Sequence, residues 1–201
     1  MTDYYYRGVN VKFNCSITSV RIGYGVTAIE PDAFYGCTSL KSVTIPSSVK
    51  SIGVGAFSGC TSLAEITVSS GNEHCCSVDG VLFDKGKKTL IRYPAGKTET
   101  SYKMPDSVTS IEDGAFEGCV ALESITIPDS VTSIGYSAFG GCVALESVTI
   151  PDRITFIRYR AARYRAHSVE DIRNGAFAGC PRLTKIVVTE YKPARRECLG
   201  W

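Results

Sequence analysis

The stretch AFEGCVALESITIPDSVTSI, residues 115–134, decides the fold because close copies of it recur along the chain. Related segments open with AFYGCTSL, AFSGCTSL, AFGGCVAL and AFAGCPRL, and they begin at Ala33, Ala56, Ala138 and Ala176. The phenylalanines of the five segments are separated by 23, 59, 23 and 38 residues. Two intervals equal one period of 23 residues, and the other two exceed it by 36 and 15. A fixed period of this size predicts a protein built from stacked repeats.

The repeating unit reads I-x-x-x-A-F-x-G-C-x-x-L-x-x-V-x-I-P-x-S-V-x-x, which is too short to enclose a hydrophobic core of its own. Its L-x-x-V-x-I portion alternates β-branched residues and predicts a short strand. The proline that follows cannot donate a ladder hydrogen bond, so it ends the strand. The A-F-x-G portion predicts a turn on the opposite side, where glycine permits a tight bend. Stacking therefore predicts a solenoid with parallel strands about 4.8 Å apart along one face.

These recurring A-F, G-C, L, V, I-P and S-V elements resemble the BspA-like class of leucine-rich repeats, and the resemblance covers nearly the whole chain. It implies an α/β solenoid with short parallel strands on the concave face and turns and short helices on the convex side. We expect one solenoid over residues 1–201. Its special parts would be a degenerate first coil at 1–28, a hairpin-containing variant coil at 69–101, an irregular basic segment at 153–171 and a C-terminal tail or cap at 189–201.

The variant coil is expected around SVDGVLFDKGKKTLIRYPAGK, residues 77–97. The runs VLF and TLIRYP flank the turn-forming DKGKK and predict a β-hairpin. BspA-like arrays carry a similar V-D-G-V-L-F element, so the resemblance assigns this hairpin to the scaffold.

One repeat position forms a structural ladder of side chains along the solenoid. It holds Asn in the degenerate first coil and Cys in the later coils: Asn14, Cys37, Cys60, Cys119, Cys142 and Cys180. We interpret the cysteines as buried thiols that act as small apolar groups with a weak donor. Disulfides are disfavoured because stacked coils would hold the Cβ vectors parallel. The vicinal Cys75 and Cys76, beside His74, lack the spacing of a zinc site, so we expect no metal.

The outward residues of the predicted strands form a candidate concave-face site, the usual partner surface of leucine-rich repeats: Arg21, Thr44, Thr67, Lys103, Thr126 and Thr149, with Val187 in the same column. A second column holds Ser19, Ser42, Glu65, Ser124, Ser147 and Lys185. Small hydroxyl side chains suit a flat polar partner. They suit the packing of stacked strands equally well.

The positive charge of the chain gathers at its C-terminal end. Residues 1–152 hold 11 Lys and Arg against 16 Asp and Glu, a net charge of −5, and residues 153–201 hold 11 against 4, a net charge of +7. The centre of this pole is RYRAARYRAH, residues 158–167, where the period breaks. Ile157 matches Ile134, but the strand expected after it is missing. We expect a protrusion with a short helix there, since Arg and Ala favour helices.

Arginines interleaved with tyrosines suit an anionic partner through hydrogen bonding and stacking. The candidate partner-binding residues are Arg153, Arg158, Tyr159, Arg160, Arg163, Tyr164 and Arg165. A degenerate repeat kept soluble by its charges would contain the same residues.

Catalysis finds no support in the sequence. The two histidines, His74 and His167, belong to no triad pattern, and no phosphate-binding loop or dinucleotide fingerprint is present. We expect no enzyme and no cofactor. No apolar run reaches the roughly 18 residues of a membrane span. The opening MTDYYYRGVN does not have the pattern of a secretory leader, so we expect an intracellular protein as written, and a cell-surface one if a leader is missing.

Our leading hypothesis is a non-catalytic module that binds other proteins, as the resemblance to BspA-like surface and adhesion proteins implies. The alternative is an intracellular structural subunit that docks into a larger assembly through the Arg/Tyr segment. A weaker alternative is a nucleic-acid-associated protein. The end coils could also stack on other chains.

Overall fold

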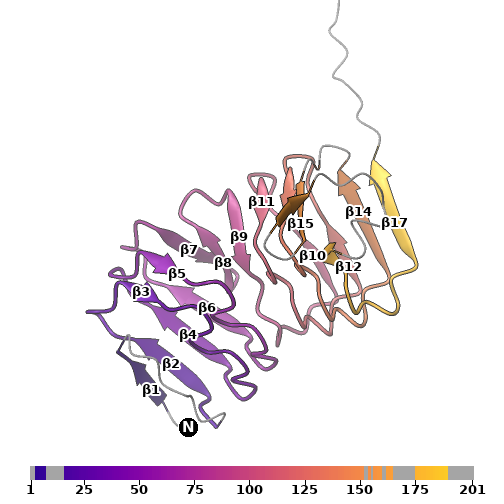
Figure 1. The fold of residues 1–201 in the computed structure, drawn as a ribbon. Helices are drawn as coiled ribbons and strands as arrows, with labels where there is room; N and C mark the ends of the chain where they lie inside the picture. Colours follow the sequence, from indigo (N-terminus) through magenta and orange to yellow (C-terminus); the bar gives the residue numbers. More distant parts are fainter. Residues whose placement is uncertain are drawn as a thin grey trace, which may run out of the picture.

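The computed structural model describes residues 3–7, 16–151, 154, 156–159, 162–164 and 175–189. These residues form a solenoid of short strands joined by turns (Figure 1). The first strands are β1 (Asp3–Tyr6), β2 (Ser19–Ile22), β3 (Ala28–Ile29), β4 (Ser42–Ile45), β5 (Ser51–Ile52), β6 (Glu65–Val68), β7 (Cys75–Val78) and β8 (Val81–Asp84). The later strands are β9 (Thr89–Arg92), β10 (Ser101–Lys103), β11 (Ser110–Ile111), β12 (Ser124–Thr126), β13 (Ser133–Ile134), β14 (Ser147–Pro151), β15 (Phe156–Tyr159), β16 (Ala162–Tyr164) and β17 (Lys185–Thr189).

Two parallel sheets form what we call the long-strand face. The N-terminal coils contribute β1-β2-β4-β6 and the C-terminal coils contribute β10-β12-β14-β17. Val20 pairs with Val43, and Val43 pairs with Ile66, so the period of the sequence is the spacing of the ladder. Val148 pairs with Ile186, 38 residues later, so the extra fifteen residues leave this ladder intact.

The inward positions of the repeat build a core that runs along the solenoid. Its most regular feature is a column of stacked phenylalanine rings. Phe34 stacks on Phe57 with centroids 5.5 Å apart, Phe116 on Phe139 at 4.9 Å, and Phe139 on Phe177 at 4.6 Å. These spacings are typical of favourable aromatic pairs, so within each half of the chain the coils that carry these rings are held together by ring packing as well as by strand pairing.

The α/β assignment and the short helices expected opposite the long strands are wrong. Among the described residues only 175–176 have helical backbone. The A-F-x-G segments instead form turns that hydrogen-bond from coil to coil, as from Phe34 N to Ala56 O at 2.9 Å and from Phe116 N to Ala138 O at 2.6 Å. An N–H group used between coils cannot serve the i→i−4 bonds of an α-helix. A glycine in the left-handed region, such as Gly118 with φ of 74°, then reverses the chain.

The helix expected in the basic segment is also wrong within its described part. β15 joins β13 in parallel, with Ile157 opposite Ile134, and β16 folds back antiparallel on β15. The free edge of β13 supplies backbone partners, and the isoleucine and tyrosines of the segment favour strands. Together these outweigh the helix propensity of Arg and Ala.

An antiparallel meander of β7, β8 and β9 interrupts the solenoid between the two halves (Figure 1). The runs that predicted a hairpin form β8 and β9. β7, which contains Cys75 and Cys76, adds a third strand that the sequence pattern did not predict.

The side chains of β8 point into both halves of the molecule. Leu82 belongs to the hydrophobic cluster of the N-terminal coils, whereas Val81 and Phe83 belong to the cluster of the C-terminal coils. All three are buried. A strand buried on both faces reads as a continuous apolar run rather than an alternating one, which is the VLF pattern.

Asn72 anchors the start of the meander. Its Nδ2 donates to Pro46 O at 2.8 Å and to Val49 O at 2.9 Å, and its Oδ1 accepts from His74 N at 2.8 Å and Cys75 N at 2.9 Å. The amide is fully buried and makes four hydrogen bonds, which is its full complement in this setting.

Candidate functional site

The long strands align the predicted concave-face residues into two columns on the long-strand face. In the N-terminal sheet Arg21 pairs with Thr44, and Thr44 pairs with Thr67. In the C-terminal sheet the same kind of column consists of Lys103, Thr126 and Thr149, which pair in that order. All of these side chains are exposed except Thr149, which is half-buried. The structure therefore brings each trio together, but on two separate sheets.

The neighbouring column of the same face is also in register. Ser19 pairs with Ser42 and Ser42 with Glu65, and in the other sheet Ser124 pairs with Ser147 and Ser147 with Lys185. Thr67 Oγ1 donates to Glu65 Oε1 at 3.0 Å. The face is thus an array of short hydroxyl groups with single charged residues in β2, β6, β10 and β17.

The long-strand face is interrupted between β6 and β10. Within the described residues these two strands belong to different sheets. The free edge of β6 is partly covered by the β7–β8 turn, because Ile66 N donates to Gly80 O at 3.1 Å and Val68 N donates to Ser77 Oγ at 3.0 Å. A hollow of about 410 Å³ with Asp79 and Lys97 in its lining remains beside them.

The cysteine column links each coil to the preceding one. The thiols of Cys60, Cys142 and Cys180 donate to the phenylalanine carbonyls of the preceding coil, at sulfur–oxygen distances of 3.0, 3.1 and 3.0 Å. All the described cysteines are free thiols. Burial raises the pKa of Cys60 to about 12, so its thiol stays protonated and can donate. Asn14 lies outside the described residues.

Within the segment predicted as a variant coil, a coil in the repeat register begins at Arg92, and the sequence analysis did not recognise this register. Tyr93 takes the phenylalanine position: its N–H donates to Ala115 O at 2.8 Å and its ring stacks on Phe116 at 5.2 Å. The spacing could have revealed this coil, since Tyr93 lies 23 residues before Phe116. It was hidden because Gly96 and Glu99 stand where the repeat has Cys and Leu.

Arg92 itself stands at the alanine position and is only 5% exposed. Its Nη1 donates to Gly114 O, and its Nη2 donates to Glu117 O at 3.1 Å. In a regular coil the second of these carbonyl positions accepts a backbone N–H, as Ser58 O accepts from Gly36 N at 2.9 Å. The guanidinium of Arg92 therefore replaces a bond of the backbone ladder.

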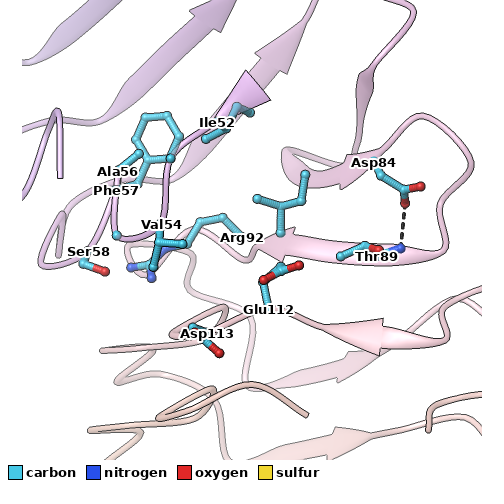
Figure 2. Close-up of a pocket in the computed structure, with 13 residues that line it drawn as sticks. Ile52, Val54, Ala56, Phe57, Ser58, Asp84, Thr89, Arg92, Glu112 and Asp113 are labelled. Carbon is cyan, nitrogen blue, oxygen red and sulfur yellow. Dashed lines mark hydrogen bonds between the residues drawn. The ribbon is translucent and has the colours of Figure 1, made fainter. Parts of the chain in front are cut away.

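Between the turn at residues 52–58 and Arg92 lies a hollow of about 450 Å³, which we call the junction cleft (Figure 2). Val54, Ala56 and Phe57 lie on one side of it (Figure 2). Its full lining is Ile52, Gly53, Val54, Gly55, Ala56, Phe57, Ser58, Asp84, Thr89, Ile91, Arg92, Glu112 and Asp113. Sequence reasoning did not find this cleft, because it forms where two coils fail to stack.

The side of the junction cleft away from the turn is acidic. Asp84, Glu112 and Asp113 contribute three carboxylates against the single guanidinium of Arg92. Asp84 Oδ1 accepts from Thr89 N at 2.6 Å and Asp113 Oδ1 accepts from Tyr136 N at 2.8 Å, so both side chains are fixed in place. Across the described residues no three His, Cys, Asp or Glu side chains converge to hold a metal ion.

Four of the candidate partner-binding residues are described by the structure: Arg158 and Tyr159 belong to β15, and Arg163 and Tyr164 belong to β16. The ladder pairs Arg158 with Arg163 and Ile157 with Tyr164, and Tyr159 lies at the end of β15. Arg153, Arg160 and Arg165 lie outside the described residues, as does His167.

Several solved structures share this fold. A leucine-rich repeat protein from Eubacterium ventriosum is 24% identical with a TM-score of 0.55, covering 86% of this chain and 60% of its own. A leucine rich cell surface protein from Faecalibacterium prausnitzii is 29% identical with a TM-score of 0.51, covering 88% and 55%. The pneumococcal vaccine antigen PcpA is 20% identical with a TM-score of 0.60, covering 93% and 66%. The chain thus spans 55–66% of the length of these proteins.

No curated protein sequence matches the chain. In the part of the chain that the structure describes, no helix has the length and apolar character of a membrane span. The family described as BspA type leucine rich repeat region matches residues 10–83 and 95–192 in six copies. The unmatched interval contains the β8–β9 turn and Arg92, where the coils depart from the repeat. With nearly all of the chain matched and the stacked coils in place, the chain belongs to the BspA-type leucine-rich repeat family.

Proposed function

We propose that this chain is a non-catalytic protein-binding module of the adhesion type, and that its partner lies across the long-strand face. The observation that carries the proposal is the alignment of Arg21, Thr44 and Thr67, and of Lys103 and Thr126, into exposed columns. Threonine and serine lose less rotamer freedom on burial than long polar side chains, so such a face binds a partner at a low entropic cost.

The family supports this proposal. Leucine-rich repeats commonly present one face to a partner, and one structural neighbour is a leucine rich cell surface protein. The thiols support a structural rather than a nucleophilic role, since burial raises the pKa of Cys60 to about 12 and that of Cys75 to about 11.

A charged substitution at the centre of each column tests the proposal. We expect Thr44→Arg and Thr126→Arg to reduce capture of partner proteins, measured by affinity purification and mass spectrometry, by at least tenfold. Thr61→Arg is the matched control, because Thr61 is an exposed threonine on a turn outside both columns. Equal capture by all three variants would remove the long-strand face from the function.

The basic segment is proposed as a second contact, toward an acidic partner surface. Positions 158 and 163, both arginines, are directly paired in the antiparallel ladder. Like charges at paired positions repel each other, and an anionic partner would relieve that repulsion. The variant with alanine at Arg158, Arg160, Arg163 and Arg165 should lose a distinct subset of partners. Unchanged capture would exclude both this contact and a subunit docked through it. Nucleic-acid binding would instead show a steep loss with salt.

A further inference from the structure

In regular coils the turns opposite the long strands are joined by a ladder of hydrogen bonds. Asp32, Phe34 and Gly36 donate their N–H groups to the following coil at 3.1, 2.9 and 2.9 Å. Gly114 and Phe116 occupy the repeat positions of Asp32 and Phe34, and their N–H groups donate to the following coil at 2.9 and 2.6 Å. The donors alternate along the chain, so the following coil presents carbonyls at every second residue, as an extended segment does.

This ladder breaks at the junction cleft. The equivalent donors are Gly55, Phe57 and Gly59, and none of their N–H groups has an acceptor among the described residues. The coil that should accept them begins at Arg92, which lines the cleft together with the turn. Gly55 and Phe57 line the cleft. Arg92, which lines the same cleft, has a buried Nε that also lacks an acceptor.

Unused backbone donors favour a ligand that supplies carbonyl oxygens. Gly55 is half-buried and Phe57 is buried, so a ligand carbonyl that pairs with their N–H groups supplies the hydrogen bonds that the next coil supplies elsewhere. The carboxylates of Asp84, Glu112 and Asp113 outnumber the one arginine, so the field in the cleft favours a cation and disfavours an anion. The volume of about 450 Å³ falls within the range of about 300–1,000 Å³ typical of ligand sites.

We propose that the junction cleft binds an extended segment of a partner protein that carries a lysine or arginine. Carbonyl oxygens two residues apart in the segment accept from the N–H groups of Gly55 and Phe57, as the next coil does elsewhere. The cationic side chain lies among Asp84, Glu112 and Asp113. The inference rests on the proposed protein-binding function and names a second site for it, separate from the long-strand face.

The test uses the whole chain and a phage-displayed library of random nonapeptides. Selection on the wild type, with counter-selection on Val54→Arg, should enrich lysine and arginine by at least about threefold over the starting library. Val54 is 64% exposed and lines the cleft, so its replacement adds bulk and a repelling charge without disturbing the core. Val120→Arg is the matched control, since Val120 is a 52% exposed valine that does not line the cleft.

The most enriched peptide is then synthesised and titrated. We expect Val54→Arg to weaken binding at least tenfold and Glu112→Gln to weaken it several-fold, with Val120→Arg and Glu123→Gln unchanged. At saturation the amide hydrogens of Gly55 and Phe57 should exchange at least tenfold more slowly, as measured by NMR. This readout reports directly on the proposed carbonyl contacts.

Any of the following results would overturn the inference: no enrichment of basic residues, unchanged exchange at both amides, or equal binding by Val54→Arg. Self-association of the chain that Val54→Arg abolishes would assign the cleft to a second copy and would also overturn it. The two proposals remain distinguishable. If Thr44→Arg abolishes partner capture but no basic peptide is selected, only the cleft proposal fails; if a basic peptide binds but the long-strand variants change nothing, only the long-strand proposal fails.

Discussion

Replacing Arg92 by alanine separates two ways of reasoning about repeats. The residue occupies a position where five other repeats have alanine, so consensus reasoning predicts that Arg92→Ala stabilises the protein. The structure predicts the opposite. The guanidinium holds the carbonyls of Gly114 and Glu117, and alanine cannot reach either of them.

The magnitude follows from those two hydrogen bonds. A bond from a charged donor contributes about 1.5–3 kcal/mol, so two would contribute about 3–6 kcal/mol. Water entering from the junction cleft would hydrate the freed carbonyls, and the cost of burying the guanidinium would disappear. These two effects offset roughly half of the loss, which leaves a destabilisation of about 2 kcal/mol.

Urea unfolding followed by far-UV circular dichroism measures this change, with the slope of the transition checked for constancy. Arg92→Lys is the control, because lysine keeps the charge but loses the fork that reaches both carbonyls. We expect it to cost about half as much as Arg92→Ala. An Arg92→Ala protein as stable as the wild type, or more stable, would refute the assignment of Arg92 as a replacement for the missing ladder.

Three further predictions concern the core. Phe116→Ala should cost about 3–5 kcal/mol of unfolding free energy, more than Phe177→Ala, because Phe116 stacks on rings on both sides; equal losses in urea titrations would contradict a role for ring stacking. Asn72→Ala should cost about 2–4 kcal/mol in the same assay, since it leaves two carbonyls and two N–H groups unpaired, and a loss below about 1 kcal/mol would show that water replaces the amide. The raised pKa of Cys60, about 12, favours the protonated thiol in the folded state, so its contribution to stability should be full below pH 9 and fall as the pH rises toward 12. Urea midpoints at pH 8, 10 and 11 measure this fall, and Cys60→Ala should show a smaller one.

The sequence predicted the long-strand face well because the information there is local and periodic. A β-branched alternation ended by proline specifies a strand, and the constant period specifies its partner, as in the pairing of Val43 with Ile66. The side opposite the strands was predicted less well. Whether A-F-x-G-C forms a helix or a turn depends on where its N–H groups donate, and that is decided by the next coil rather than by the segment itself.

The junction cleft could not be predicted from the repeat pattern. Its lining comes from the turn at 52–58, from β8 and β9, and from Glu112 and Asp113, which meet only because the meander separates two coils. Arg92 gave a signal, since an arginine at an alanine position conflicts with a packed coil. Its meaning depends on the space beside it, which no property of the residue reveals.

The double-sided burial of β8 has a mechanical consequence. A solenoid with unbroken ladders resists bending as a stiff rod, and each coil passes load to its neighbour through many parallel hydrogen bonds. Here the long-strand ladder is interrupted in the middle of the molecule. The two halves are joined there by a few backbone hydrogen bonds, such as Gly96 N to Leu63 O at 2.7 Å, and by the side chains of β8, with Leu82 in one core and Val81 and Phe83 in the other. We therefore expect the solenoid to bend more readily at its centre than within either half.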